Sequence, residues 1–208
     1  MLTYHRPDRY HQLLTFISTV FAAMNSAFRR KVIACNGALT FTNTTPDQQG
    51  IQMSQDTLSA AENSAMREAV DRAFRAMKQS GKAGIAATIL LDGTSVGWGE
   101  NEVSLQSDPT KHAEMVALTA AAKHLGTTDL SQCVMISTLQ PCEMCLAAMR
   151  FSGIKRVIFG ATQEKVAAKY FVFPMFSIAD FQSAGEPFEA IGGQCEDELL
   201  SIYIDGQE

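Results

Sequence analysis

Apolar residues recur with a helical period in the stretch that follows residue 58. They are Ala61, Ala65, Met66, Ala69, Val70, Ala73, Phe74 and Met77. Ser59 and Glu62 have the spacing of a capping box at the start of this run, and Gly81 stands just after it. The pattern therefore predicts an amphipathic helix that begins near Ser59 and stops at Gly81.

Two shorter runs have the length and composition of β-strands. The first spans Ile85 to Leu91 and the second spans Ser95 to Gly99. Asp92, Gly93 and Thr94 separate them, and a short connection of this composition suits a hairpin. We therefore expect the sheet to begin with an antiparallel pair of strands.

Helical and strand patterns alternate from residue 108 onward. The first helix follows a turn at residues 108–110 and ends at Gly126. The second helix spans Pro141 to Phe151 and is closed by Gly153. The strands that alternate with these helices are Val134 to Thr138 and Arg156 to Gly160. This order predicts parallel pairing with right-handed crossovers.

The pattern is weaker beyond Gly160. It fits a helix over Gln163 to Tyr170, a short edge strand over Phe188 to Ile191 and a closing helix over Glu196 to Ile204. The segment from Lys169 to Glu189 is rich in aromatic residues, and we expect most of them to pack in the core. One or two of them are candidates to roof a substrate pocket.

Residues 1–57 are predicted to form an N-terminal extension and linker, and residues 58–208 a catalytic domain. The linker is assigned to residues 36–57, which are rich in Asn, Thr, Gln, Gly and Asp and lack apolar periodicity. Upstream of the linker, the residues around Leu13 to Phe28 are predicted to form an amphipathic helix that packs on the domain or on a partner subunit. Alternatively, the extension results from a start codon that was assigned too far upstream. A secretory signal fits this stretch less well, because hydroxyl side chains interrupt it and no A-x-A cleavage site precedes Arg29.

Composition and charge narrow the classes of function. The chain has 208 residues, 46% of them hydrophobic, which is enough for one compact domain with an appendage. A formal net charge of -5 argues against a protein built to lie on a polyanion, although it leaves room for a local basic patch. The five cysteines are scattered in a chain too large to need disulfide bonds, so we expect a soluble, cytoplasmic protein with no membrane partner.

Two short segments carry the candidate chemistry, and each lies where a strand or a turn passes into a helix. They are His112-Ala113-Glu114 and Pro141-Cys142-Glu143-Met144-Cys145. A helix N-terminus stabilises thiolates, and two cysteines three residues apart at that position can face one point. A histidine from a neighbouring helix start completes three corners of a tetrahedral zinc site, and the fourth stays open for water, as in catalytic zinc sites. We therefore predict one Zn²⁺ per subunit, held by His112, Cys142 and Cys145.

Glu114 is the candidate for proton transfer. Zinc lowers the pKa of a bound water molecule, so that a nucleophile forms near neutral pH. Hydrolysis of a ring amino group also needs protons at the ring nitrogen and at the departing ammonia, and a carboxylate beside the metal can collect and return them. Residues two apart point to nearly opposite sides in mid-helix, but in the first turn, with the helix end aimed at the metal, His112 and Glu114 can share a site.

Each motif taken alone has another interpretation. A lone C-x-x-C also fits a redox dithiol, and a lone H-x-E also fits a solvated helix start. Their co-occurrence, with Pro141 before Cys142, favours zinc, because a redox dithiol has little use for an H-x-E at another helix start. Cys133 lacks the paired spacing and is interpreted as core packing.

At these residues the sequence resembles the cytidine deaminase-like superfamily, whose zinc deaminases carry an H-x-E and a P-C-x-x-C pattern. The likeness spans Met66 to Thr162, and DPTKHAEMVAL and LQPCEMCLAAMRFSGIKRVIFGAT look most like the branch of guanine deaminases, fungal-type cytosine deaminases and tRNA adenosine deaminases. The resemblance implies a three-layer α/β/α fold with a mixed, mostly five-stranded sheet and both metal-bearing helices on one side. It also implies that Asn101 binds substrate and that the protein forms a homodimer.

The sequence departs from these relatives at two places. They have a Pro-x-Gly-Ala-like stretch on the first strand where this chain has Gly84-Ile85-Ala86-Ala87, so we expect the packing of the pocket to differ there. They have a small residue where this chain has Lys111, just before the predicted histidine ligand. Lys111 is interpreted as a solvent-facing side chain, with contact to an anionic substrate group as the alternative.

The leading hypothesis is hydrolytic deamination of an amino-bearing nucleobase or nucleoside of the guanine, cytosine or adenine type, with release of ammonia. The alternative is adenosine-to-inosine editing of tRNA, which needs basic surface around the pocket. The dense basic cluster of the sequence is Arg150, Lys155, Arg156, Lys165 and Lys169. A non-catalytic zinc protein is less favoured, since such a protein is expected to lose Glu114 or a ligand.

Overall fold

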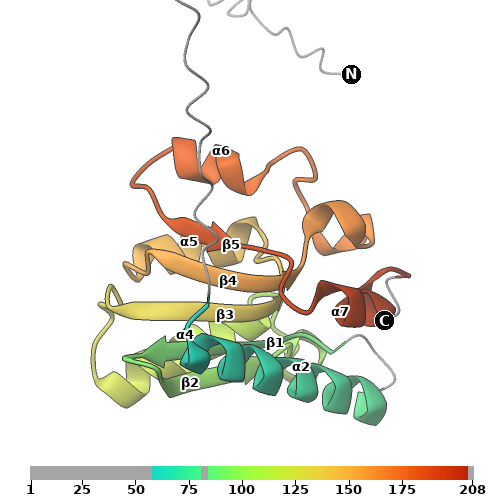
Figure 1. Cartoon of the computed structure of the whole chain (residues 1–208), viewed down its shortest axis with the longest axis horizontal. Coiled ribbons are helices and arrows are strands. Elements are labelled where there is room, and N and C mark those ends of the chain that lie inside the picture. The colour runs from blue at the N-terminus through green and yellow to red at the C-terminus, as the bar shows by residue number, and fades with distance from the viewer. Residues whose placement is uncertain (1–57, 81–83, 206–208) are drawn as a thin grey trace, which may run out of the picture. The chain divides into compact units, whose positions relative to one another are not determined.

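The computed structural model describes residues 58–80 and 84–205, which form a five-stranded sheet with helices on both faces (Figure 1). The predicted extension and linker over residues 1–57, and the predicted helix stop at Gly81, lie outside the described residues. The strands are β1 (Ala86–Leu91), β2 (Thr94–Glu100), β3 (Cys133–Leu139), β4 (Arg156–Ala161) and β5 (Glu189–Ile191). The helices are α2 (Ala60–Ser80), α3 (Val103–Gln106), α4 (Ala113–Leu125), α5 (Glu143–Phe151), α6 (Ile178–Ser183) and α7 (Glu196–Tyr203).

The sheet is mixed, in the order β2-β1-β3-β4-β5. β1 and β2 form the predicted antiparallel hairpin, and Asp92 and Gly93 at its tip both have positive φ, as a tight two-residue hairpin turn requires. β4 pairs in parallel with β3, as predicted, and it also pairs in parallel with the edge strand β5. β3, however, pairs with β1 and not with β2, so the connection from β2 to β3 skips one strand.

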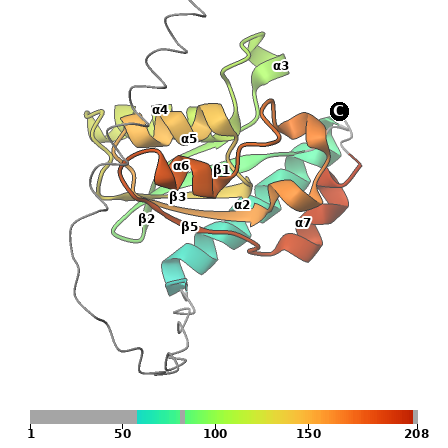
Figure 2. The ribbon, with the colours of Figure 1, turned by 90° about the horizontal axis from the view of Figure 1, so that it is seen from above.

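Alternate residues of the strands face two separate helix layers (Figure 2). On β1, Ala87 and Ile89 belong to the core under α4 and α5, whereas Ala86 and Leu90 belong to the core under α2 and α7. The two helices that carry the candidate ligands therefore lie on the same face of the sheet, as the resemblance implied. Among the described residues, no helix is long and apolar enough to cross a membrane.

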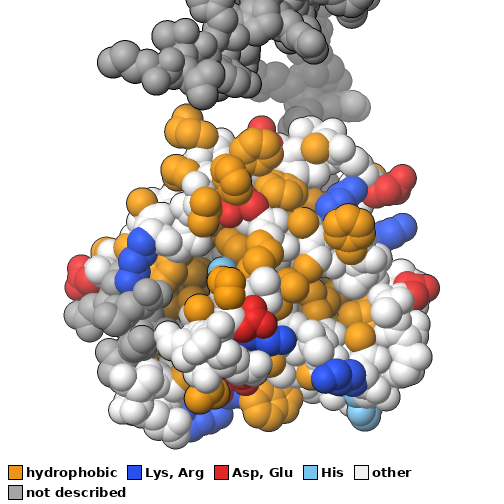
Figure 3. Space-filling model, turned by 180° about the vertical axis from the view of Figure 1, so that it is seen from behind, with side chains coloured by type: hydrophobic (Ala, Val, Ile, Leu, Met, Phe, Trp, Pro, Cys, Tyr) orange, Lys and Arg blue, Asp and Glu red, His pale blue; other side chains and the backbone are white. Residues whose placement is uncertain are grey.

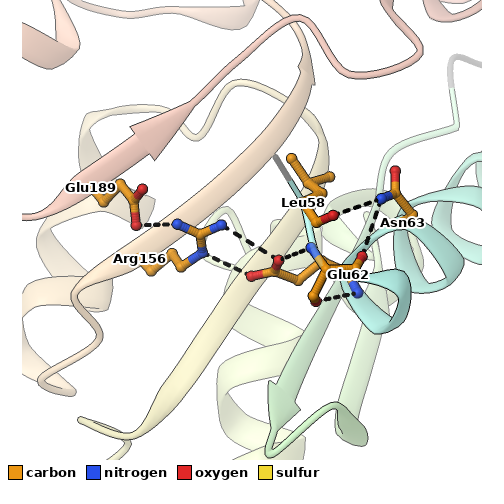
Figure 4. Close-up of polar contacts among 6 residues, drawn as sticks. Leu58, Glu62, Asn63, Arg156 and Glu189 are labelled. Atoms are coloured by element: carbon orange, nitrogen blue, oxygen red, sulfur yellow. Dashed lines mark hydrogen bonds and ion pairs between the residues drawn. The ribbon is translucent and has the colours of Figure 1, made fainter. Parts of the chain in front are cut away.

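The predicted capping box begins α2 and is part of an ion-pair network (Figure 4). The Glu62 carboxylate accepts a hydrogen bond from the backbone N–H of Ser59 at 2.7 Å, and the Ser59 hydroxyl accepts one from the N–H of Glu62 at 3.2 Å. Arg156 at the start of β4 pairs with Glu62 at 2.7 Å and also with Glu189 on β5. Burial opposes ionisation of Glu62, but these hydrogen bonds together lower its pKa. The network fixes the start of α2 against the start of β4.

The part of the chain after β4 differs from the sequence prediction. The predicted helix over Gln163 to Tyr170 is two short 3₁₀ turns, Gln163–Lys165 and Ala168–Tyr170, because Val166 is extended between them and the N–H of Ala167 bonds to the carbonyl of Tyr203. The edge strand and the closing helix were predicted correctly as β5 and α7. α3 and α6 were missed, since neither has a fully buried residue to give it an apolar period.

β2 approaches α4 unusually closely, because its inward positions are glycines. A methyl group on Gly99 would lie 2.5 Å from the carbonyl oxygen of Ala113, and one on Gly97 would lie 2.5 Å from the backbone nitrogen of Ala121. Real side-chain carbons essentially never make such contacts, so only glycine fits between strand and helix here. The close packing holds the first turn of α4, which carries Glu114, against the sheet.

We expect Gly99→Ala to lower the free energy of unfolding by about 1–3 kcal/mol, the range for overpacked sites. The added methyl group must displace the backbone of α4, as its neighbour is not a flexible side chain. Gly185→Ala is the control, since there the nearest atom is the end of the Arg150 side chain, which can move. Urea denaturation gives the free energy of unfolding of both variants. Equal values for the two would contradict the close packing of β2 against α4.

Candidate metal centre and active site

His112, Cys142 and Cys145 converge on one point where two helices begin. His112 is the residue before the first turn of α4, Cys142 is the corresponding residue of α5, and Cys145 lies in the first turn of α5. The Cys142 sulfur is 3.5 Å from His112 Nδ1 and 3.6 Å from the Cys145 sulfur. The Cys145 sulfur is 3.7 Å from His112 Nδ1. Among residues 58–80 and 84–205, these three make up the one cluster of His, Cys, Asp and Glu side chains with metal-site spacing.

The spacing of these three atoms fits zinc. With Zn–S bonds of about 2.3 Å, Zn–N bonds of about 2.0–2.1 Å and tetrahedral angles, two sulfurs would lie about 3.8 Å apart and a sulfur and a nitrogen about 3.6 Å apart. The three separations differ from these values by about 0.2 Å or less, which is the tolerance expected of a genuine site. Two thiolates and an imidazole are also a donor set that zinc prefers.

The two thiols are unequal, because they share one hydrogen bond. The hydrogen bond between the Cys142 and Cys145 sulfurs, opposed by burial and aided by His112, lowers the pKa of Cys142 to about 4. The same interaction raises the pKa of Cys145, which is buried beside Glu114. One thiolate is thus already favoured at neutral pH, as expected of a metal ligand at a helix N-terminus.

The Glu114 side chain lies beside this group in the first turn of α4 and is only 4% exposed. The Ser137 hydroxyl on β3 donates a hydrogen bond to Glu114 Oε1 at 3.0 Å, and Glu114 Oε2 is 3.5 Å from the Cys145 sulfur. Burial raises the pKa of Glu114. Because His112 precedes the helix proper, it and Glu114 reach the same site although they are two residues apart.

A cavity of about 170 Å³ opens beside His112, Glu114 and Cys142. The predicted substrate residue Asn101 lines it, and its side-chain oxygen accepts a hydrogen bond from the N–H of Val103 at 3.2 Å. A second cavity of about 560 Å³ adjoins the first and shares three lining residues with it: Ile85, Asn101 and His112. The structure therefore brings all five predicted site residues together: four of them line this cavity, and Cys145 is fully buried in the ligand cluster.

Several other residues of the smaller cavity were missed in the sequence. They are Leu139, Gln140 and Val172, whereas Lys169 and Tyr170, which also line it, belong to the predicted basic cluster and aromatic segment. Gln140 directly precedes the Pro141-Cys142 motif, and this adjacency could have identified it as a residue that lines the cavity. Lys111, by contrast, does not line either cavity and lies 3.9 Å from Asp108, which favours its interpretation as a surface side chain.

The segment from Val172 to Phe176, of which Val172 lines the cavity, is hydrogen-bonded to the start of α5. The N–H of Phe173 donates to the Glu143 carboxylate at 3.1 Å. Gln140 and Gln163 exchange two hydrogen bonds of 3.1 Å, and Gln163 also donates to the carbonyl of Pro174. The aromatic residues here divide as expected: some pack in the core, and Tyr170 lines the cavity, but Phe173 and Phe176 are exposed.

The described chain is similar to known zinc-binding deaminase sequences. A family model described as "Cytidine and deoxycytidylate deaminase zinc-binding region" matches residues 59–161. The tRNA-specific adenosine deaminase of Haemophilus influenzae is 37% identical over 143 residues, which cover 66% of this chain and 80% of that protein. The guanine deaminase of Bacillus subtilis is 37% identical over 81 residues, which cover 39% of this chain and 52% of that protein.

Other matches are longer proteins of which this chain resembles a small part. A tRNA(Ile)-lysidine synthase of Deinococcus deserti is 42% identical over 76 residues, which cover 36% of this chain and 14% of that protein. The corresponding match in Deinococcus radiodurans covers 18% of the relative. The chain therefore spans less than a fifth of the length of these two relatives.

Solved structures share the arrangement of the sheet and helices. A structure from a study of A-to-I editing by tRNA:A34 deaminases has a TM-score of 0.57 and 29% identity, and the match covers 67% of this chain and 98% of that one. A guanine deaminase from Nitrosomonas europaea has a TM-score of 0.60 at 22% identity, with coverage of 81% and 96%. The three-layer fold predicted from the sequence is confirmed.

We expect Cys142→Ser and Cys145→Ser each to lower the zinc content of the purified protein from one ion per chain to below half, since a neutral hydroxyl is a poor replacement for a thiolate ligand. Cys133→Ala is the control, because Cys133 is buried at the start of β3 and lies outside the ligand cluster. Elemental analysis by mass spectrometry gives the number of zinc ions per chain. Full zinc in the serine variants, or loss of zinc in Cys133→Ala, would show that the ligands are misassigned.

Proposed function

Because the chain belongs to the cytidine and deoxycytidylate deaminase family, we propose that it removes an amino group from a nucleobase or nucleoside by zinc-dependent hydrolysis, with release of ammonia. The observation that carries this proposal is the convergence of His112, Cys142 and Cys145 beside the buried Glu114. Hydrolytic deamination needs a metal site with an open position and a nearby acid-base group, and this arrangement provides residues for both. We further propose that the catalytic domain is residues 58–208.

Each side chain of the site has a distinct task in this proposal. His112, Cys142 and Cys145 hold one zinc ion, whose chemistry when bound is to lower the pKa of water so that a nucleophile is available near neutral pH. Glu114 takes a proton at its carboxylate and delivers protons to the ring nitrogen and to the leaving amino group. Its burial keeps the carboxylate away from bulk water, so that protons pass to the substrate.

Asn101 is assigned to substrate binding. Its side chain lines both cavities at the point where they join, next to His112. The bond from the N–H of Val103 occupies one lone pair of the Asn101 oxygen and fixes the orientation of the amide, which leaves its NH₂ group as a donor toward a ring. A fixed amide beside the metal ligands favours one orientation of a planar heterocycle.

The size of the cavity supports a small substrate. At about 170 Å³ it is below the roughly 300–1,000 Å³ of pockets for drug-sized ligands, so it suits a single base, with the adjoining cavity available to a sugar. Two of the five residues of the basic cluster are held in ion pairs: Arg156 pairs with Glu62 and Glu189, and Lys165 pairs with Glu196. These pairings and the acidic net charge favour a free base or nucleoside over a polynucleotide.

The second candidate is adenosine-to-inosine editing of tRNA. It is supported by the similarity to the tRNA-specific adenosine deaminase of Haemophilus influenzae, of which this chain covers 80%. Tyr170, which lines the cavity, and the exposed Phe173 and Phe176 further along the chain are also of a kind that stacks on unpaired bases. An anticodon stem-loop therefore belongs in any substrate panel.

We also propose a homodimer in the cytoplasm. The four described cysteines are all free, which supports a reducing compartment. Hydrophobic side chains gather on the α4 and α5 side of the molecule (Figure 3), and the most exposed large ones include Phe151 at 94% and Met175 at 92%. Exposed apolar side chains of this size support an interface with a second copy.

Glu114→Ala is expected to lower kcat for ammonia release by at least about a hundredfold, the low end of the contribution of general acid-base catalysis. The zinc content should stay at one ion per chain, since Glu114 is not one of the three ligands. Glu68→Gln on α2 is the control for a change of charge alone and should leave kcat unchanged. Retention of most of the activity in Glu114→Ala would overturn the proton-transfer assignment even with zinc in place.

Asn101→Ala is expected to raise KM about tenfold for the preferred base or nucleoside, because it removes a hydrogen bond made in the bound state. The measurement is a panel of free bases, nucleosides and an anticodon stem-loop, each followed by release of ammonia. Asn63→Ala is the control, since Asn63 bonds only to the start of its own helix α2. Reaction of the stem-loop alone would favour the second candidate, and an unchanged KM in Asn101→Ala would contradict the substrate-binding role.

A further inference from the structure

Ser137 is a polar residue on the face of β3 whose neighbours Cys133 and Met135 belong to the apolar core under α4 and α5. It lies on β3 with no exposed surface, between Ala87 of β1 and Phe159 of β4 in register. The inward positions around it belong to the core under α4 and α5. A buried hydroxyl in such a position costs free energy unless it is hydrogen-bonded, and its partner here is the Glu114 carboxylate.

The hydrogen bond makes the two oxygens of Glu114 unequal. Ser137 Oγ donates to Oε1 at 3.0 Å, whereas Oε2 lies 3.5 Å from the Cys145 sulfur. One oxygen therefore faces the strand and the other faces the ligand cluster. β3 ends at Leu139, and Gln140 and Pro141 connect it directly to Cys142 at the start of α5, so the segment that carries the hydroxyl leads straight into the cysteine pair.

A glutamate needs such a restraint, because its long side chain has several rotatable bonds and loses substantial entropy when it is fixed in one geometry. Catalytic geometry must be held to within about 0.5 Å, and groups held by neighbouring hydrogen bonds on regular elements meet this requirement best. In the described structure Ser137 is the side chain that donates to the Glu114 carboxylate through an oxygen. The other side chain hydrogen-bonded to this carboxylate among the described residues is that of Cys145, which is itself a predicted metal ligand.

We propose that Ser137 is a positioning residue, which holds Oε1 of Glu114 so that Oε2 faces the metal ligands and the substrate cavity. The inference rests on the proposed function, since it assigns a partner to the proton-carrying carboxylate. Ser137 does not line the cavity, so its effect on the reaction passes through Glu114 alone. Loss of the hydroxyl should therefore slow the reaction without weakening the binding of substrate.

Thr138 provides a matched control on the same strand. It is also fully buried, but its side chain faces the opposite layer, where its hydroxyl pairs with the Tyr203 hydroxyl at 2.8 Å and accepts from the N–H of Ala86 at 3.1 Å. Thr138→Val removes a buried hydroxyl next to Ser137 without touching the site. It should lower stability and leave kcat and KM per folded, zinc-loaded chain within about twofold of the unaltered protein.

The test compares kcat, KM, zinc content and melting temperature for the unaltered protein, Ser137→Ala, Ser137→Thr and Thr138→Val on the best substrate of the panel. Ser137→Ala should lower kcat about tenfold, because a hydrogen bond to a charged group is lost, with KM and zinc content unchanged. Ser137→Thr keeps the hydroxyl and should recover most of kcat. If Ser137→Ala does not fold, Ser137→Cys keeps the shape with a weaker donor and should show the loss of kcat instead.

A kcat within twofold of the unaltered protein in the folded alanine or cysteine variant would overturn the inference. Loss of zinc, or a rise in KM equal to the fall in kcat, would also overturn it, because both would indicate a structural role. Absence of ammonia release from the unaltered, zinc-loaded protein on every substrate would reject the proposed function instead. Failure of the Ser137 inference would therefore be seen in the Ser137 variants, and failure of the proposed function would be seen in the unaltered protein.

Discussion

The site depends on two helix N-termini that meet at one end of the sheet. β2 and β3 are both antiparallel to β1, so their carboxyl ends lie at the same end, and the helices that follow them, α4 and α5, pack on the same face. His112 and Cys142 each precede the first turn of one of these helices, where unpaired N–H groups favour negative charge. The packing of the glycines of β2 against α4 holds one of the two ends in place. The geometry of the ligands follows from the topology of the sheet.

Much of this arrangement could be predicted from the sequence, because its signals are local. The capping box at Ser59, the Asp-Gly hairpin turn and the glycine after α4 each correspond to a specific backbone geometry. The H-x-E and C-x-x-C motifs likewise point to candidate ligands by their spacing at helix starts. These features do not depend on residues far away in the chain.

The rest could not be predicted, because it is set by long-range packing. Nothing in the sequence of β3 indicates that it pairs with β1, and the turns between residues 163 and 170 depend on a backbone bond to Tyr203 at the end of the chain. The link from Ser137 to Glu114 joins residues 23 positions apart on different elements. Ser137 was open to prediction only as a polar residue in a buried strand, which on its own does not identify a partner.

The central claim is that His112, Cys142 and Cys145 hold one zinc ion at a site with an open position. X-ray absorption at the zinc edge of the purified protein tests it most directly, since the technique reports the number and type of ligand atoms. We expect two sulfur atoms at about 2.3 Å from the zinc and two nitrogen or oxygen atoms at about 2.0–2.1 Å from it. Four sulfur ligands, or a protein that folds and deaminates its substrate with no zinc, would contradict it.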